Sequence, residues 1–196
     1  VACGGGGKKV SRIDASSTTD LSGKWNDTDS RLVADEMIND CLNRPWYSKM
    51  AQDLGRNPTV VVGKVRNKSH EHISVETFTK DMERALINSG MVDFVANAEA
   101  RAELRAEVAD QMGNTTEETR KEAGMETGAD LMLTGTLNSI VDQEGGESVI
   151  FYQIDLELTD LQSHKKLWIG DKKIKKYVSQ SGVKVLFFLF KKTSLG

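Results

Sequence analysis

The first ordered pattern along the chain is a helical stripe of apolar side chains. Two series of apolar residues recur every four positions there: Val33, Met37 and Cys41, and Ala34, Ile38 and Leu42. This spacing predicts an amphipathic helix with one buried face. We expect Asp29 to be its N-cap and Pro45 to end it. Because Cys41 falls on the apolar face, we expect a buried thiol there.

The next segment alternates between strand and helix patterns. The β-branched run TVVVGKV (59–65) predicts a strand, and its continuous apolar start indicates a central position that is buried on both faces. A helix is expected over 75–87, with Ser74 as its cap and Gly90 as its stop. A short strand at 91–96 and a charged helix over about 98–112 follow. Asn114 or Thr115 is expected to cap a further short helix that ends at Gly124.

After residues 128–130 the apolar period changes from helical to alternating. LMLTGTLNSIV (131–141) reads as a strand, and DQEGGES reads as a hairpin turn with Gly145 and Gly146 at its tip. VIFYQIDLELTD (149–160) alternates strictly, which predicts an antiparallel strand with one buried face. KLWIGDKKIKKYV (166–178) is expected to be a third strand.

These elements together predict an α/β (α+β) fold. The expected order is α-β-α-β-α-α-β-β-β, in which two right-handed crossovers precede a meander. We therefore expect a mixed sheet of four to five strands flanked by helices. The chain of 196 residues accommodates one domain and a tail.

Charge is distributed unevenly along the chain. The net charge is −3, but residues 165–196 carry nine Lys and one Asp, which leaves −11 for residues 1–164. We interpret the lysines as protection of an exposed sheet edge, which is more common for such a run than ligand binding. An acidic overall balance without a basic stripe argues against nucleic acid as a partner. The longest apolar run, VKVLFFLF (183–190), is too short to cross a membrane.

The sequence offers little for catalysis. Its three histidines are His70, His72 and His164, and no GxSxG elbow occurs. His70 and His72 could supply two metal ligands, but a zinc site needs at least three. Asp155 and Glu157 share one strand face, where such pairs are more often solvated than catalytic. We therefore expect no enzyme, and neither a cofactor, a metal nor a small-molecule substrate.

The loop RNKSHEHIS after the first strand is the better candidate for function. It lies at the carboxyl end of a strand expected to be central, where open α/β sheets place their binding groups. An ordinary connecting loop is the alternative interpretation. The residues expected to bind a partner are Arg66, Asn67, Lys68, His70, Glu71 and His72.

Several extended segments resemble the LpoB family of outer-membrane lipoproteins. The resemblance runs over roughly residues 20–177 and includes DLSGKWNDTDSRLVADEMINDCLNRPW, VVVGKVRNKSHEHISVETFTKDMERALINSG, TGADLMLTGTLNSIV and FYQIDLELTDLQSHKKLWIGDKKIKK. It implies a fold like the amino-terminal domain of TolB. It also implies a non-catalytic protein that binds and activates a bifunctional, class A penicillin-binding protein in peptidoglycan synthesis. An envelope assembly or secretion lipoprotein of the related CsgG type is the alternative.

The same resemblance implies that Cys3 is the lipidated residue. Val1 and Ala2 before it fit the end of a lipobox, and Gly4 after it favours the outer membrane, with the domain facing the periplasm. Residues 1–24 are then a lipobox remnant and a flexible tether, and residues 25–178 are the globular domain. The tether lacks proline, and its extended limit is roughly 75 Å. Residues 179–196 are left as a tail or an extra strand.

Overall fold

The sheet is the scaffold of the domain, and it is mixed as predicted. The computed structural model describes residues 10–114 and 126–179. Its described elements, in chain order, are α1 (Asp27–Leu42), α2 (Pro45–Leu54), β1 (Thr59–Asn67), α3 (Val75–Ser89), β2 (Asp93–Phe94), α4 (Ala98–Asn114), β3 (Leu131–Glu144), β4 (Glu147–Asp160) and β5 (Lys166–Ser179). The short helix expected over 115–124 and the run 183–190 lie outside the described residues.

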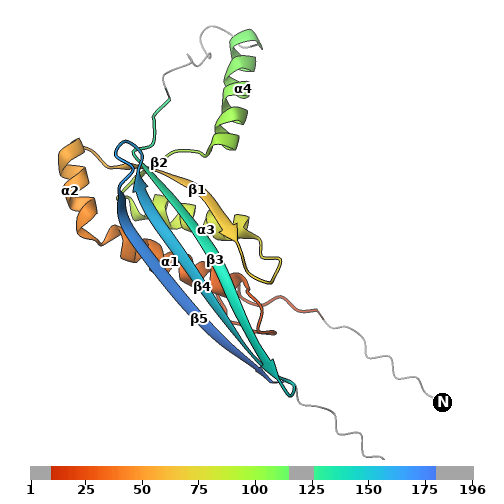
Figure 1. Ribbon diagram of the computed structural model, residues 1–196. Coiled ribbons are helices and arrows are strands. Elements are labelled where there is room, and N and C mark those ends of the chain that lie inside the picture. Colours follow the sequence, from red (N-terminus) through yellow and green to blue (C-terminus); the bar gives the residue numbers. More distant parts are fainter. Residues whose placement is uncertain (1–9, 115–125, 180–196) are drawn as a thin grey trace, which may run out of the picture.

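The strands follow the order β2-β1-β3-β4-β5 (Figure 1). β1 pairs in parallel with both β2 and β3, whereas β3, β4 and β5 form an antiparallel meander. The crossovers through α3 and α4 account for the parallel half, because parallel neighbours cannot be joined by a tight turn. The predicted α+β class and the interior place of β1 are therefore confirmed.

The start of α1 differs from the prediction. Asn26, not Asp29, is the N-cap: its side chain accepts a hydrogen bond from the Asp29 amide at 3.1 Å. The Asp29 carboxylate in turn accepts one from the Asn26 amide at 3.0 Å, which completes a capping box. Asp29 is thus the third helical residue, and the sequence pattern alone does not separate these two roles.

Helix α2 was not predicted. Pro45 does end the first helix, but it also stands at the first position of the next one, where its missing N–H costs nothing. Trp46 anchors this helix, since its indole Nε1 donates to the Cys41 carbonyl oxygen at 2.7 Å. Gly55 closes it with a left-handed backbone conformation, φ 65°.

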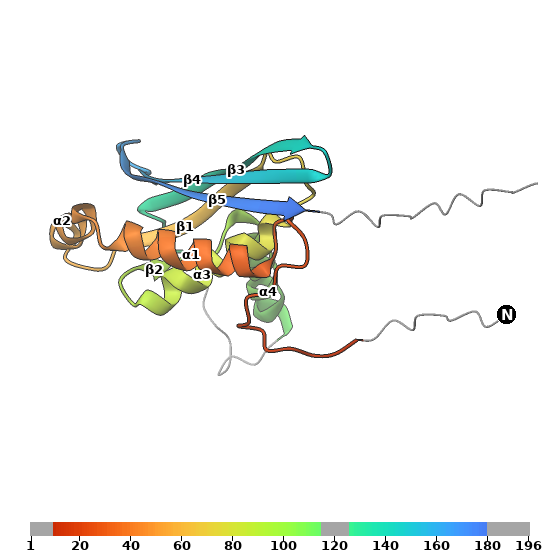
Figure 2. The ribbon, with the colours of Figure 1, turned by 90° about the horizontal axis from the view of Figure 1, so that it is seen from below.

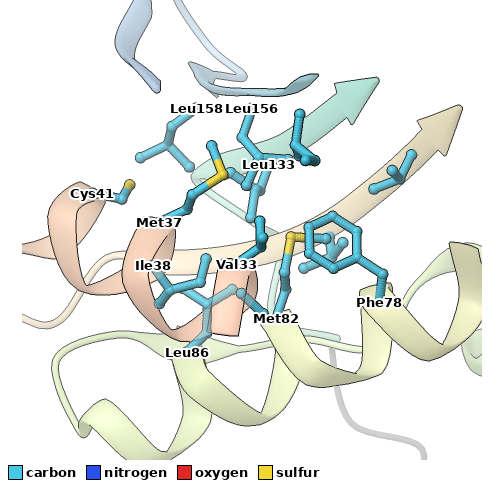
Figure 3. Close-up of a cluster of buried hydrophobic side chains, with 14 of the residues drawn as sticks. Val33, Met37, Ile38, Cys41, Phe78, Met82, Leu86, Leu133, Leu156 and Leu158 are labelled. Carbon is cyan, nitrogen blue, oxygen red and sulfur yellow. The ribbon is translucent and has the colours of Figure 1, made fainter. Parts of the chain in front are cut away.

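The core lies between one face of the sheet and helices α1 and α3 (Figures 2 and 3). Met37 and Ile38 from α1 meet Met82 and Leu86 from α3 beneath the strands. The strands contribute the buried residues Val60, Val62, Leu131, Leu133, Leu137, Tyr152, Ile154, Leu156 and Leu158. Cys41 is buried as expected, and burial raises the pKa of its thiol to about 12. The thiol is therefore protonated and inert at neutral pH.

The opposite face of the sheet is not covered by any described helix (Figure 2). β4 shows the consequence clearly, because its even-numbered residues from Ile150 to Leu158 are buried and its odd-numbered ones from Phe151 to Thr159 are only half-buried. This alternation confirms the predicted half-buried strand. β5 forms one edge of the sheet and lies beside α1.

Helix α4 stands apart from the core (Figure 1). None of its residues is buried, and Leu104 is 58% exposed. Its Arg105 pairs with Glu126 at the start of the segment that leads to β3. The helix therefore contributes much less to the core than α1 and α3 do.

Two leucines on these helices give a matched test of the core. Leu86 of α3 is 2% exposed, whereas Leu104 of α4 is 58% exposed. We predict that Leu86→Ala lowers the free energy of unfolding by about 2–5 kcal/mol, because it leaves a cavity under the sheet. Leu104→Ala should change it by no more than about 0.5 kcal/mol. Urea titrations followed by circular dichroism measure both; equal effects would contradict this assignment of the core.

Candidate partner-docking site

The loop after β1 is built around Asn67. Its side-chain oxygen accepts hydrogen bonds from the amide and the hydroxyl of Ser69, at 2.9 and 2.7 Å. Its side-chain nitrogen donates to the Glu71 carbonyl oxygen at 2.8 Å. These bonds close residues 67–71 into a compact turn of the kind that Asn side chains favour. The Lys68 amide extends the pairing with β3 by donating to the Leu137 carbonyl oxygen at 2.8 Å.

Glu71 turns back into the domain. Its side chain is 11% exposed, and its carboxylate accepts hydrogen bonds from the Trp25 amide at 3.2 Å and the Tyr152 hydroxyl at 2.5 Å. Burial, and then the bond to Glu71, raise the pKa of Tyr152, so its hydroxyl remains a donor at neutral pH. A buried carboxylate needs such donors, because an unpaired one is costly. Glu71 thus fastens the loop to the sheet and to the segment before α1.

His70 lies flat against β3. Its amide donates to the Ser139 hydroxyl oxygen at 3.0 Å, and its Nδ1 lies 2.6 Å from the same oxygen. The other ring nitrogen, Nε2, lies 3.3 Å from the Glu71 carboxylate, so both nitrogens of this imidazole have a neighbour within the domain. The ring is nevertheless 42% exposed, so its outer edge remains accessible.

Three of the predicted residues share one groove of about 610 Å³. His70, Glu71 and His72 form one wall, and the segment around Trp25 together with the first turns of α1 and α3 forms the others. The complete lining is Lys24, Trp25, Asn26, Asp27, Ser30, His70, Glu71, His72, Ile73, Ser74 and Thr77. The groove is mixed in polarity, with an indole, two imidazoles and several hydroxyl groups.

The other predicted residues lie elsewhere. Arg66 faces the uncovered side of the sheet, where it lines a shallow pocket of about 250 Å³ with Thr136 and Asp155. A register shift between Val62 and Val65 sets this orientation of Arg66. The Lys68 side chain is exposed, and Asn67 is occupied within the loop. The structure therefore divides the six predicted residues between the groove, the turn and the open face of the sheet.

Residues 20–25, which we call the strap, form the part of the site that the sequence did not indicate. They were assigned to the tether up to residue 24, yet they run past the end of β5 and contact it (Figure 2). The Lys176 ammonium donates to Asp20 at 2.8 Å, to the Lys24 carbonyl oxygen at 3.1 Å and to Asp29 at 2.6 Å. Although burial opposes it, these carboxylates raise the pKa of Lys176.

Within the described ranges 10–114 and 126–179, no group of three or more His, Cys, Asp or Glu side chains is arranged to hold a metal ion. In the same ranges, no helix is long and apolar enough to cross a membrane. The residues that line the groove offer hydrogen-bond donors and acceptors beside the indole of Trp25.

Comparison with known families assigns the domain. The profile of the peptidoglycan-synthase activator LpoB matches residues 29–174, which is most of the chain. The chain belongs to the LpoB family. The family comprises activators rather than catalysts, and its lipoproteins are associated with the cell envelope. The general role of this LpoB-family chain is thus activation of peptidoglycan synthesis.

Solved structures of similar proteins include an LpoB domain and another lipoprotein. The LpoB C-terminal domain from Escherichia coli is 19% identical; the match covers 69% of this chain and 94% of that one, with a TM-score of 0.36. A lipoprotein from Neisseria meningitidis is 17% identical over 64% of this chain and 88% of that one, with a TM-score of 0.40. No curated protein matches the chain.

The contacts of Lys176 give a test of how firmly the strap is held. We predict that Lys176→Met lowers the free energy of unfolding by about 1–3 kcal/mol, because the Asp29 carboxylate, 9% exposed, loses its cation. The matched control is Lys175→Met on the exposed side of the same strand, which should change it by about 0.5 kcal/mol or less. Chemical denaturation at neutral pH measures both, and similar losses in the two variants would contradict a specific role of Lys176.

Proposed function

We propose that this LpoB-family chain is a lipid-anchored protein of the outer membrane that faces the periplasm. On this proposal it binds a bifunctional, class A penicillin-binding protein and stimulates it without catalysing a reaction itself. The match of the LpoB profile over residues 29–174 carries the proposal. Activation by binding requires a shaped surface on the activator rather than reactive groups.

The groove and the loop beside it are the proposed docking surface. Lys68 and His72 present an ammonium group and an imidazole to the outside, and His70 adds an exposed ring edge, while Asn67 and Glu71 hold the backbone of the loop beneath them. A loop that is held before binding loses less conformational entropy when a partner orders it. We assign Arg66 to the margin of this surface, because it faces the open side of the sheet.

Because the strap lies on the domain, the free tether between the proposed anchor and the domain is shorter than the sequence predicts. If residues 20–25 stay on the domain, at most residues 4–19 separate Cys3 from it, and Ser16 and Ser17 of that stretch also contact α1. Fully extended, sixteen residues span roughly 55 Å, against roughly 75 Å for the tether expected from the sequence. The part of the synthase that meets this domain must therefore lie within that distance of the outer membrane, which favours a synthase domain that projects far into the periplasm.

The first test measures binding and stimulation together. We predict that the chain raises the glycan polymerisation rate of a purified class A penicillin-binding protein from the same organism. The double variant Lys68→Gln with His72→Asn should bind at least about fivefold more weakly, because it alters two exposed contacts of the docking surface. The result is read by titration of the synthase with each variant.

The matched control for that test lies in the turn between β4 and β5. It carries the same changes at Lys165→Gln and His164→Asn, and Asn tolerates the positive φ of 58° at position 164. This control should bind as the unchanged chain does. Equal weakening in both double variants would argue against the loop as the docking surface, and a chain that neither binds nor stimulates any class A synthase would refute the function.

The second test concerns the anchor. We predict that Cys3→Ser in the full precursor moves the protein from the outer-membrane fraction to the soluble periplasmic fraction. Each buried methylene of an attached acyl chain contributes about 0.8 kcal/mol, and the serine variant loses all of them. Cys41→Ala, which changes the buried cysteine instead, should stay in the membrane fraction. Recovery of Cys3→Ser in the membrane fraction would contradict lipid anchoring.

A further inference from the structure

The strap is held by three different side chains of the domain. Lys176 binds Asp20 and the Lys24 carbonyl oxygen, and the Tyr152 hydroxyl lies 3.1 Å from the Gly23 carbonyl oxygen. Glu71 accepts from the Trp25 amide. These three side chains come from β5, β4 and the loop after β1, so the strap lies across elements that are far apart in the sequence.

Gly23 shows how closely the strap approaches the sheet. A Cβ atom at this position would lie 2.3 Å from Cγ2 of Val178 and 3.0 Å from Cδ1 of Ile150. Both distances are shorter than van der Waals contact, so any larger residue must displace the strap or the two side chains. Trp25 then packs edge-on against Phe78 and Tyr152, with ring centroids 6.1 and 5.7 Å apart.

Glu71 connects this strap to the docking loop. One carboxylate oxygen accepts from Trp25 of the strap, the other accepts from Tyr152, and the Glu71 carbonyl oxygen closes the turn made by Asn67. If the strap leaves, the carboxylate loses the Trp25 amide and keeps the Tyr152 hydroxyl as its donor from the sheet. The carboxylate then shifts toward its remaining donors, and the loop backbone that ends in the Glu71 carbonyl oxygen shifts with it.

We propose that the strap sets the position of residues 67–73 through the carboxylate of Glu71, which makes Glu71 a positioning residue for the docking loop. A pull on the proposed anchor at Cys3 reaches the strap once the contacts of Ser16 and Ser17 with α1 have given way. The coupling between strap and loop is independent of any partner, and only its consequence for docking rests on the proposed function.

Amide hydrogen exchange on the full chain tests the coupling. We predict that Gly23→Ala speeds the exchange of the His70 and Ile73 amides by about tenfold, because the loop opens when the strap is displaced. The matched control is Gly113→Ala on α4, where an added Cβ meets nothing within 4 Å and loop exchange should not change.

A second variant covers the case in which the strap accommodates the alanine of Gly23→Ala without moving, so that this change alone would not test the coupling. Tyr152→Phe removes the hydroxyl that approaches both Gly23 and Glu71, and it should also speed loop exchange. Loop exchange that stays unchanged in both Gly23→Ala and Tyr152→Phe overturns the inference, whether or not the strap itself exchanges faster.

A double variant tests the route through Glu71. Glu71→Gln alone should speed loop exchange, and adding Gly23→Ala to it should change that rate by less than about twofold, because the two changes break the same connection. If the two effects instead multiply as independent ones do, the coupling does not run through Glu71 and the assignment of this residue is wrong.

Measuring the Kd for the synthase then distinguishes a failure of the inference from a failure of the proposed function. The Kd of Gly23→Ala should rise with its loop exchange, while that of Gly113→Ala should not change. Normal binding by a variant whose loop has opened would overturn the positioning role. If the unchanged chain does not bind, the proposed function fails, and the exchange rates still decide the coupling between strap and loop.

Discussion

In β4 every second side chain from Ile150 to Leu158 is buried in the core, and the side chains between them face away from every described helix. This one-sided burial constrains the remainder of the domain. It fixes the register of the strands, because a slip of one residue would carry the whole apolar set to the open face. It also decides which polar residues lie at the margins of the helical layer, where the groove and the strap are found.

The lysines of β5 show that the side of the sheet on which a lysine lies determines which groups its charge can pair with. The sequence interpretation treats them as protection of an exposed edge. In the structure, Lys172 and Lys176 point to the helix side, where they pair with Glu36 and Asp29 of α1. The Glu36 pair is well exposed and adds little stability. Lys176 differs because its side chain is only 11% exposed and its ammonium group has three acceptors, so it joins β5, α1 and the strap.

Local pattern was enough to predict most of the fold. Three of its elements have patterns that lie within one short stretch of sequence: the apolar stripe of α1, the β-branched run of β1 and the alternation of β4. Pro45 shows where such signals are ambiguous, since the same residue ends one helix and begins the next. The strap was missed for a different reason. Its partners, Lys176 and Tyr152, lie more than 125 residues away, and composition alone marked it as a polar linker.

The six predicted site residues lie on or beside one loop, but their individual roles could not be predicted from their residue types. Asn67, His70 and Glu71 are all polar residues of a short loop. By residue type, each side chain can form hydrogen bonds to a partner protein as readily as to its own domain. What separates them is the sheet beneath: Ser139 and Tyr152 are placed by β3 and β4 to receive His70 and Glu71. An activator that works by binding alone depends on such internal bonds, because they determine which donors remain for the partner. His70 keeps an exposed ring edge although its two ring nitrogens lie beside Ser139 and Glu71.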